Sequence, residues 1–525
     1  MVVVVVASAE ALRGADYMAK SRLIVVVVLS LLVISMLGVV VAQAGEWEKP
    51  EWWTGYNSRV GEYYVKPGYP PYEANARYIG ELRGTWEEMG VQYGERAGDL
   101  VRLVWDGYYE QMIRTVGDPD LLVEEARNFA DFLGKISPEA IEFMQGIAKG
   151  SEEELNKSFY AVGDSFDKIV VINHYFALRR IFNEEWTPGK EVKVVATSGA
   201  DIPEELAACS GMVVLGTFGG PTSDRTTIHS GTKDQQFFPQ MYQVSYVAVP
   251  SDPNAHKFWT LSSAGEIGGQ MAGNDKGVIV SGYAGANSPN YWAYGIEWNI
   301  GCWYGAAFAG DLEEALEILT VGRPSYREAT GRATLTPAWG INWLVSDMRD
   351  AGVVETRPGH YAVRRVGDLG EEDFIVCTNH AMADHSYDEN NVLTDIPFTV
   401  FGPYDGPYAG MISSGGRYWT LWWQIKNNYG NIDANMVMDW YKEHYFIDEA
   451  GNRHDYWWLD GIGWHDPAHA PMRCTLCRHS GDSATNTDAK VGVAQDLAFY
   501  FTVGRPCEWV GPWDVISLRY SDFRN

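Results

Sequence analysis

Cysteine and basic residues are both scarce in this sequence. Six cysteines in 525 residues are too few for a fold held together by disulfides. The 41 Lys and Arg residues are outnumbered by 69 Asp and Glu, and the net charge of −28 argues against nucleic-acid binding because a phosphate backbone would be repelled. Glycine-rich phosphate loops, serine nucleophile elbows and internal repeats are also missing, so neither a P-loop nucleotide site nor an elbow-type serine hydrolase site is predicted.

Apolar residues are plentiful, with 46% hydrophobic and 13% aromatic content, which suffices for a large core. Lys20 and Arg22 precede an apolar run over residues 23–42, and small residues follow at a signal-peptidase spacing. The run exceeds the roughly 7 to 15 residues of most signal cores and approaches the roughly 20 that span a bilayer. Residues 1–44 are therefore predicted to be a signal peptide or a signal anchor, with the rest of the chain secreted or membrane-anchored facing outward.

Sequence periodicity separates the segments that follow. Residues 45–75 are rich in Trp, Tyr and Pro and predict a surface linker. Residues 76–208 show helical periodicity and predict an all-helical segment, with Thr85 and Glu88 as the capping box of its first helix. Further helices are expected over residues 119–133, over residues 138–148 with Ser137 as the cap, and from residue 152 onward with Ser151 and Glu154 as a capping box.

From residue 209 the period changes to that of β-strands. Short apolar segments separated by glycine-rich turns predict a meander with strands at residues 209–217, 226–230, 242–249, 258–262 and 278–283. Helices are expected at 292–308, 311–319 and 434–445, and further strands at 342–346, 353–356, 361–364 and 374–378. Residues 209–525 are thus predicted to form an α+β domain in which two antiparallel sheets pack face to face between helical layers.

Cys209 stands where the period changes. It opens an apolar strand, the small residues Ala207 and Ala208 precede it, and Asp234 lies on or just after the next predicted strand. This pattern suits a nucleophile released by cleavage of its own chain between Ala208 and Cys209, which leaves the thiol and an α-amine on one residue. An α-amine titrates at about 7.7 to 8.0 and a thiol near about 8.5, so the amine can take the thiol proton near neutral pH. On spacing alone, a buried apolar residue or half of a disulfide is the commoner role for such a cysteine.

Further segments occur in the order typical of one enzyme family: residues 82–94 (LRGTWEEMGVQYG), 146–150 (GIAKG), 273–277 (GNDKG), 377–380 (CTNH) and 477–479 (CRH). With the Cys209 segment, they make the chain from about residue 82 onward resemble the N-terminal nucleophile (Ntn) hydrolases of the acyl-coenzyme A:6-aminopenicillanic acid acyltransferase family, relatives of acid ceramidase and phospholipase B-like proteins. The resemblance implies a four-layer αββα sandwich with an N-terminal helical segment. It also implies self-cleavage into an α chain, residues 76–208, and a β chain, residues 209–525, which stay associated and need no cofactor.

The resemblance also implies roles for residues around Cys209. Asp234 would hold the Cys209 amine by a charge-assisted hydrogen bond, Asn379 would hold the oxyanion, and Arg478 would orient the centre. Residues expected to contact the substrate are His229, Thr232 and His380. The family usually has Arg or Gln three residues before the aspartate, where this sequence has Gly231, so no side chain is available here for the contacts that Arg or Gln would make.

A zinc site is an alternative use of the C-terminal cysteines. Cys474 and Cys477 have an admissible spacing, and the available partners would be His465, His469 and His479. No second cysteine pair accompanies them, and an exported protein more readily forms a disulfide, so no metal is predicted.

Other features have plain structural explanations. Asn173 matches a helix asparagine of the family but is most simply a polar group in a packed helix. The tryptophans clustered late in the chain are expected mainly in the core, and walls of an acyl pocket are the alternative. Without Cys209, Asp234 and Asn379 would be taken for ordinary turn residues.

These features together predict an exported, self-processing cysteine hydrolase or acyltransferase that cleaves a linear carbon–nitrogen amide bond through an acyl-thioester on Cys209. Its partner would be a small-molecule amide or lipid-like acyl substrate, and neither nucleic acid nor a cofactor is expected. One alternative is a phospholipase B-like lipid amidase or esterase, or a cysteine dipeptidase, using the same residues. The other is a non-catalytic extracellular protein that binds a glycan or lipid between aromatic walls.

Overall fold

The computed structural model describes residues 77–183, 209–235, 242–285, 293–330, 335, 337–357, 360–380, 382, 413–455, 475–477, 486–502, 506 and 513–519. All of them belong to one compact unit, Thr54–Gly61 with Tyr72–Asn525. The predicted signal segment, the linker, Ala208 and Arg478 lie outside the described residues. Within the described ranges, no helix combines the length and apolar character needed to cross a bilayer.

The described residues before Cys209 form a strand followed by helices: β1 (Arg77–Gly84), α2 (Trp86–Val116), α3 (Pro119–Ile136), α4 (Pro138–Gly150), α5 (Glu152–Leu155), α6 (Ser165–Asn173) and α7 (Tyr175–Asn183). The predicted capping box of α2 is confirmed, because Thr85 Oγ1 accepts from Glu88 N at 3.2 Å and Glu88 Oε2 accepts from Thr85 N at 2.8 Å. Gly117, with φ 70°, ends the helix as expected.

Three predictions for this segment are wrong. It is not all-helical, because β1 pairs in parallel with β4 (Gln243–Pro250) and so belongs to a sheet of the domain that follows. Ser137 and Ser151 make no capping hydrogen bond through their side chains, since the preceding helices run directly into them. The helix predicted from residue 152 onward stops after one turn, and separate helices begin at Ser165 and Tyr175.

The larger sheet has eight strands in the order β1-β4-β5-β6-β7-β8-β9-β10. The strands after β4 are β5 (Phe258–Ser263), β6 (Met271–Asn274), β7 (Ile279–Ala284), β8 (Ile341–Ser346), β9 (Ala351–Arg357) and β10 (His360–Arg365). From β4 to β10 each strand pairs antiparallel with the next in the chain, so only the β1–β4 pair makes this sheet mixed.

The smaller sheet has six strands in the order β11-β2-β3-β14-β15-β16. These strands are β2 (Cys209–Val214), β3 (Ile228–Gln235), β11 (Phe374–Cys377), β14 (Asn486–Val493), β15 (Ala498–Phe501) and β16 (Asp514–Ser517). The single meander predicted from residue 209 is therefore wrong. The chain leaves the six-stranded sheet after β3 and continues in the eight-stranded sheet at β4, because alternation in a strand defines its buried face but not its partner.

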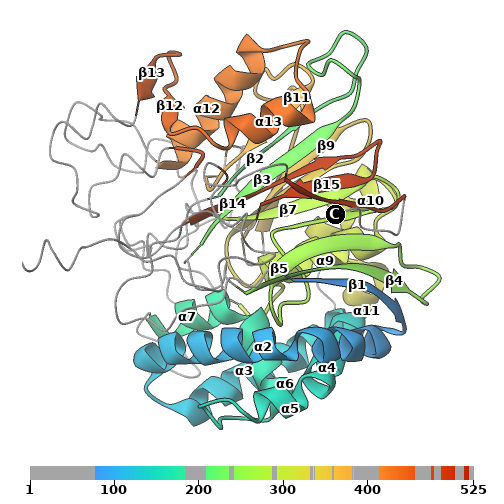
Figure 1. Cartoon of the computed structure of the whole chain (residues 1–525), viewed down its shortest axis with the longest axis vertical. Coiled ribbons are helices and arrows are strands. Elements are labelled where there is room, and N and C mark those ends of the chain that lie inside the picture. The colour runs from blue at the N-terminus through green and yellow to red at the C-terminus, as the bar shows by residue number, and fades with distance from the viewer. Residues whose placement is uncertain are drawn as a thin grey trace, which may run out of the picture. The chain divides into compact units, whose positions relative to one another are not determined.

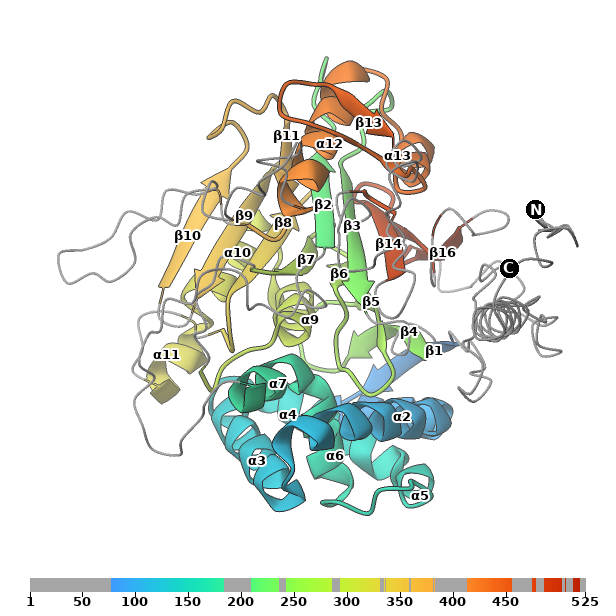
Figure 2. The same ribbon diagram turned by 90° about the vertical axis from the view of Figure 1, so that its left-hand side faces the viewer.

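Helices cover each sheet (Figure 1, Figure 2). The helices α9 (Trp298–Phe308) and α10 (Leu312–Thr320) contact the eight-stranded sheet, where Gly301 lies against the Trp343 ring. The helices α12 (Ser413–Asn427) and α13 (Ala434–Trp440) contact the six-stranded sheet. The remaining elements are α11 (Pro324–Thr330), β12 (Tyr445–Ile447) and β13 (Arg453–Asp455). Mixed and antiparallel sheets with separate helices define an α+β fold, as predicted.

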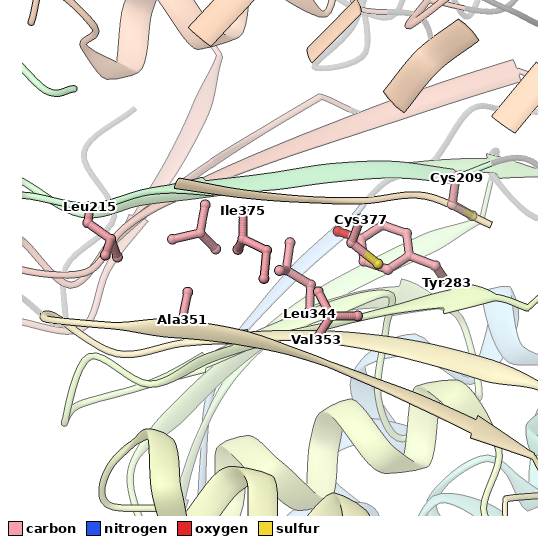
Figure 3. Packing of buried hydrophobic residues seen from close by; sticks show 9 residues of the cluster. Cys209, Leu215, Tyr283, Leu344, Ala351, Val353, Ile375 and Cys377 are labelled. Atoms are coloured by element: carbon pink, nitrogen blue, oxygen red, sulfur yellow. The ribbon is translucent and has the colours of Figure 1, made fainter. Parts of the chain in front are cut away.

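The two sheets meet through an apolar cluster that reaches Cys209 (Figure 3). Strands β2 and β11, with Leu215 directly after β2, contribute one side of the cluster, and strands β7, β8 and β9 contribute the other. Its members are Cys209, Val213, Leu215, Tyr283, Leu344, Ala351, Val353, Ile375 and Cys377. The side chain of Cys209 consequently points toward the eight-stranded sheet, at the end of the cluster where β2 begins.

Candidate active site

Cys209 begins β2 and lies between two partner strands. On β3 its cross-strand partner is Lys233, and Ser210 faces Thr232. On the other side, β11 pairs with β2 from Gly211 onward. The cysteine is 8% exposed, so its environment is that of the protein interior.

Two polar side chains hold the backbone of Cys209. Asn379, directly after β11 and Thr378, accepts a hydrogen bond from Cys209 N through its Oδ1 at 2.8 Å. Arg417 on α12 donates to the Cys209 carbonyl, to Ser210 Oγ at 2.7 Å and to Asn379 Oδ1 at 2.8 Å. The guanidinium therefore links the first two residues of β2 to Asn379, a fork that lysine cannot reproduce.

Asn379 is itself held by further hydrogen bonds from its side chain and its backbone. Its Nδ2 donates to Ala284 O at 2.8 Å, and its backbone N donates to Ser414 Oγ at 2.9 Å. In this arrangement the amide oxygen, not the nitrogen, faces Cys209. Nδ2 carries two hydrogens, of which Ala284 accepts one, so the oxyanion role predicted for Asn379 requires the other.

Asp234 follows Lys233 on β3 and lies close to the thiol. Its Oδ1 accepts from Thr487 Oγ1 on β14 at 2.6 Å. Burial raises the pKa of the Cys209 thiol to about 11, and the Asp234 carboxylate adds to this rise. A hydrogen bond from the Asp234 backbone and the charges of Arg417 and Lys233 oppose it. A thiol with this pKa is protonated near neutral pH and needs a base to become nucleophilic.

Charged side chains lie on the inner face of β3 and β14, beyond the apolar cluster. Lys233 Nζ lies 3.7 Å from Glu266 Oε2 and 4.5 Å from the centroid of the Trp298 ring. On β14, Lys490 pairs with Asp488, whose other oxygen accepts from Gln243 Nε2 at 2.7 Å. Buried charges cost several kcal/mol each unless paired, and groups of them are often found at functional sites.

The Tyr283 hydroxyl occupies the space above two glycines beside Cys209. A Cβ on Gly211 would lie 1.8 Å from Tyr283 Oη, and a Cβ on Gly231 would lie 2.7 Å from it. The hydroxyl bonds Ser281 Oγ at 2.7 Å and Ser230 O at 3.4 Å. The space that a side chain at position 231 would need is thus filled by a tyrosine from β7.

The predicted substrate residues differ in their distance from Cys209. Thr232 Oγ1 accepts from Ser210 N at 3.0 Å and so joins β2 to β3. His380 Nδ1 lies 2.7 Å from Ser414 Oγ, behind Asn379. His229 faces Val213, four residues along β2 from Cys209 or about 13 Å, and lies between Ser346 Oγ and Ser281 Oγ. The structure therefore places Thr232 opposite Ser210, next to Cys209 in the chain, and leaves His229 in the core between the two sheets.

Arg417 is the residue that the sequence analysis missed. No helix was predicted over α12, because its first residues, Ser413 to Gly416, are small and polar and show no helical period. The available signal was a lone arginine entering the aromatic stretch that contains Tyr418 and Trp422, where an unpaired charge is not tolerated. Arg478, the arginine predicted instead, lies outside the described residues.

Within the described ranges, no group of three or more His, Cys, Asp or Glu side chains is arranged to hold a metal ion. Cys477 is buried, whereas Cys474, His465, His469 and His479 lie outside those ranges.

No protein-family model and no curated protein matches this sequence. Solved structures similar to it include two variants of conjugated bile acid hydrolase from Clostridium perfringens. Both are 13% identical over 59% of this chain and over 92% and 93% of theirs, with TM-scores of 0.33 and 0.32. A Caenorhabditis elegans N-acylethanolamine-hydrolyzing acid amidase ortholog is 12% identical over 55% of this chain and 93% of its own, with a TM-score of 0.26. These neighbours are hydrolases by name, and at such TM-scores the likeness is remote.

Proposed function

We propose that this protein is a self-processing Ntn cysteine hydrolase that cleaves a linear carbon–nitrogen amide bond through an acyl-thioester on Cys209. The observation that carries the proposal is that two side chains bind the backbone of Cys209: Asn379 accepts from its nitrogen and Arg417 donates to its carbonyl. Any buried residue needs partners for its backbone N–H and C=O, and at Cys209 both partners are polar side chains, brought from α12 and from the segment after β11 to the residue that carries the thiol.

Self-cleavage would begin when the Cys209 thiol attacks the Ala208 carbonyl and the peptide bond shifts to a thioester. This shift breaks the bond to the Cys209 nitrogen and so frees the α-amine, and water then hydrolyses the thioester, which frees the Cys209 thiol and the carboxyl of Ala208. The nitrogen that now donates to Asn379 Oδ1 is the one that would become this amine. The contact is therefore compatible with both the intact and the cut chain.

In catalysis the new amine would act as the base. It takes the proton of the Cys209 thiol while the sulfur attacks the acyl carbon, and it returns that proton to the leaving amine as the tetrahedral intermediate collapses. The resulting thioester is hydrolysed by water, or taken by an acceptor amine in an acyl transfer. Before the cut, burial raises the pKa of the thiol to about 11, which keeps it protonated at neutral pH, so an adjacent base is needed to form the thiolate.

Contacts across residue 209 support association of the two pieces after the cut. Strand β1 pairs with β4, Asn173 on α6 donates to Gly265 O at 2.8 Å, and Ala177 N donates to Glu297 Oε1 at 2.7 Å. The helix–sheet–sheet–helix contacts, with α12 and α13 on one sheet and α9 and α10 on the other, favour the four-layer αββα sandwich. The apolar segment 23–42 favours export, with the catalytic unit outside the cytoplasm.

The test is expression of the wild-type chain and of Cys209→Ala, followed by reducing, denaturing electrophoresis and N-terminal sequencing. The wild type is expected to give a piece beginning with Cys209, and Cys209→Ala is expected to give one uncut, inactive chain. Both proteins are then assayed on N-acyl amino acids, β-lactams, ceramides, short peptides, N-acylethanolamines and conjugated bile acids. An active wild type that stays intact across residues 208 and 209 would contradict self-processing. A cut protein that hydrolyses none of these amides but cleaves phospholipid esters would favour the lipid esterase instead, and a protein that neither cuts nor reacts would favour a binding protein.

A further inference from the structure

Lys233 is held in a fixed position on the inner face of the strand pair that carries Cys209. The two residues are direct cross-strand partners, so their Cβ atoms lie about 5 Å apart on one face of the sheet. The ammonium lies 3.7 Å from Glu266 Oε2, 3.5 Å from Ser263 Oγ and 4.5 Å from the Trp298 ring centroid. A carboxylate, a hydroxyl and an aromatic face together orient a cation that is itself buried.

The loop that carries Glu266 is fixed by the helices that precede Cys209. Gly265 N donates to Tyr93 Oη on α2 at 2.9 Å. Asn173 on α6 donates to Gly265 O at 2.8 Å and accepts from Ile267 N at 2.9 Å. Both backbone neighbours of Glu266 are therefore bound by the N-terminal segment, which gives Asn173 a role beyond that of a polar group in a packed helix.

Stability alone is a weak explanation for a buried ion pair at this position. Replacing a buried pair by apolar residues of similar volume is often neutral or stabilising, because desolvation offsets the attraction of the charges. The neighbouring strand β14 places Asp488 across from Lys233, so the cation lies between the nucleophile and a second carboxylate. The other ionisable groups that face Cys209 or Lys233 are Asp234 on β3, Lys490 on β14, Tyr283 on β7, Cys377 on β11 and Arg417 on α12.

We propose that Lys233 is a positioning residue for Cys209, with its ammonium held by Glu266 so that it stabilises the negative charge on sulfur as the proton leaves. The inference rests on the proposed function, since it assigns Cys209 the part of a nucleophile. It also makes the helical segment a lasting part of the site, because Tyr93 and Asn173 fix the loop that orients Lys233.

The experiment measures the rate at which iodoacetamide alkylates Cys209 between pH 6 and pH 11, with mass spectrometry of the Cys209 peptide as the readout. Lys233→Met is compared with Lys168→Met, a matched control in which a buried lysine near an indole ring is lost far from Cys209, on α6. Lys233→Arg keeps a cation, and the double variant Lys233→Met with Glu266→Gln removes both charges of the pair. The double variant takes the place of Lys233→Met if that single variant fails to fold because Glu266 is left buried and unpaired.

The expected result is a labelling profile displaced upward by about one pH unit in Lys233→Met, since a nearby opposite charge typically lowers an acid's pKa by about one to three units. A smaller upward displacement is expected in the double variant, because the loss of the Glu266 carboxylate offsets part of the loss of the cation. Below the midpoint this displacement is a tenfold lower labelling rate at fixed pH. Lys168→Met and Lys233→Arg are expected to keep the wild-type profile. If Lys233→Met labels like Lys168→Met, or if the double variant labels no more slowly than Glu266→Gln alone, Lys233 is an ordinary structural lysine, even when wild-type cleavage and turnover uphold the proposed function. If the wild type neither cuts its chain nor turns over an amide, the proposed function fails, and the role of Lys233 fails with it.

Discussion

Replacing Arg417 by methionine tests how the site is held together. The guanidinium is fully buried and donates to Cys209 O, Ser210 Oγ and Asn379 Oδ1. Methionine has a similar length but no donors, so the Cys209 carbonyl loses this partner and Asn379 Oδ1 keeps only Cys209 N. A buried acceptor left unsatisfied costs about 1 to 3 kcal/mol, and a lost hydrogen bond from a charged donor is worth about 1.5 to 3 kcal/mol. The unsatisfied Cys209 carbonyl and the lost second bond of Asn379 Oδ1 therefore together give a loss of about 3 kcal/mol, as Ser210 Oγ can rotate.

A loss of about 3 kcal/mol leaves most domains folded, since typical unfolding free energies are about 5 to 15 kcal/mol. The function should suffer more, because displacement of a reacting group by about 1 Å can cost about a hundredfold in rate. Arg417→Met is therefore expected to fold, to cut its chain slowly and to lose about a hundredfold in turnover. Urea unfolding followed by tryptophan fluorescence gives the stability, and timed denaturing gels give the rate of cutting.

Two control variants test whether the effect comes from the three hydrogen bonds that Arg417 donates. Arg417→Lys keeps the charge but cannot span all three acceptors, so an intermediate loss is expected. Arg327→Met removes a half-exposed arginine paired with Glu317 at 3.2 Å, and a loss below about 1 kcal/mol is expected. If Arg417→Met unfolds at the urea concentration of Arg327→Met and cuts at the wild-type rate, the contacts of Arg417 do not hold the nucleophile.

Three shorter predictions follow from the same contacts. Asn379→Ala should lower turnover by about a hundredfold or more with little change in KM, as expected for a group acting mainly in the transition state, and wild-type activity would remove Asn379 from the site. Gly231→Ala should lower the free energy of unfolding by about 1 to 3 kcal/mol, because its Cβ would lie 2.7 Å from Tyr283 Oη, and adding Tyr283→Phe should recover most of the loss in urea unfolding. Burial lowers the pKa of His229 to about 3, so below about pH 6.5 this side chain is protonated in the unfolded chain but stays neutral in the folded chain. The free energy of unfolding is therefore unaffected by protonation of His229 above that pH and falls by about 1.4 kcal/mol per pH unit as the pH drops toward 3. In urea unfolding, His229→Asn should flatten this part of the pH dependence.

Local signals predicted those elements whose ends are encoded nearby in the chain. Thr85 and Glu88 marked the start of α2, and Gly117 marked its end, because caps and left-handed glycines act within one helical turn. Strands β5 and β7 were also placed within two residues of their observed bounds. The assignment of strands to two sheets was not predictable in this way, since pairing depends on residues far apart in the sequence.

The candidate site shows the same division between local and distant information. Cys209 and Asp234 lie on consecutive strands, so a hairpin was enough to bring them together. Asn379, 170 residues away, was found only through the resemblance to a family, and the structure places it on the Cys209 nitrogen. The aromatic residues after Arg417 indicated only that it is buried, and the residues beside Lys233 gave no such sign, so neither cation could be assigned its distant partners from the sequence.

The burial of Cys209 bears on when the proposed enzyme becomes reactive. In the intact chain its nitrogen is a peptide nitrogen, which cannot accept a proton, and the pKa of its thiol is raised to about 11 by burial. The precursor thiol is therefore nearly unreactive toward outside electrophiles, while the adjacent Ala208 carbonyl needs no diffusion to reach it. Cleavage would then place a protonatable amine on the same residue, whose positive charge, added to those of Arg417 and Lys233, would lower the thiol pKa. In this proposal the thiol would react only with its own chain until the cut creates the base, and the buried cations Arg417 and Lys233 would set how large that change in reactivity is.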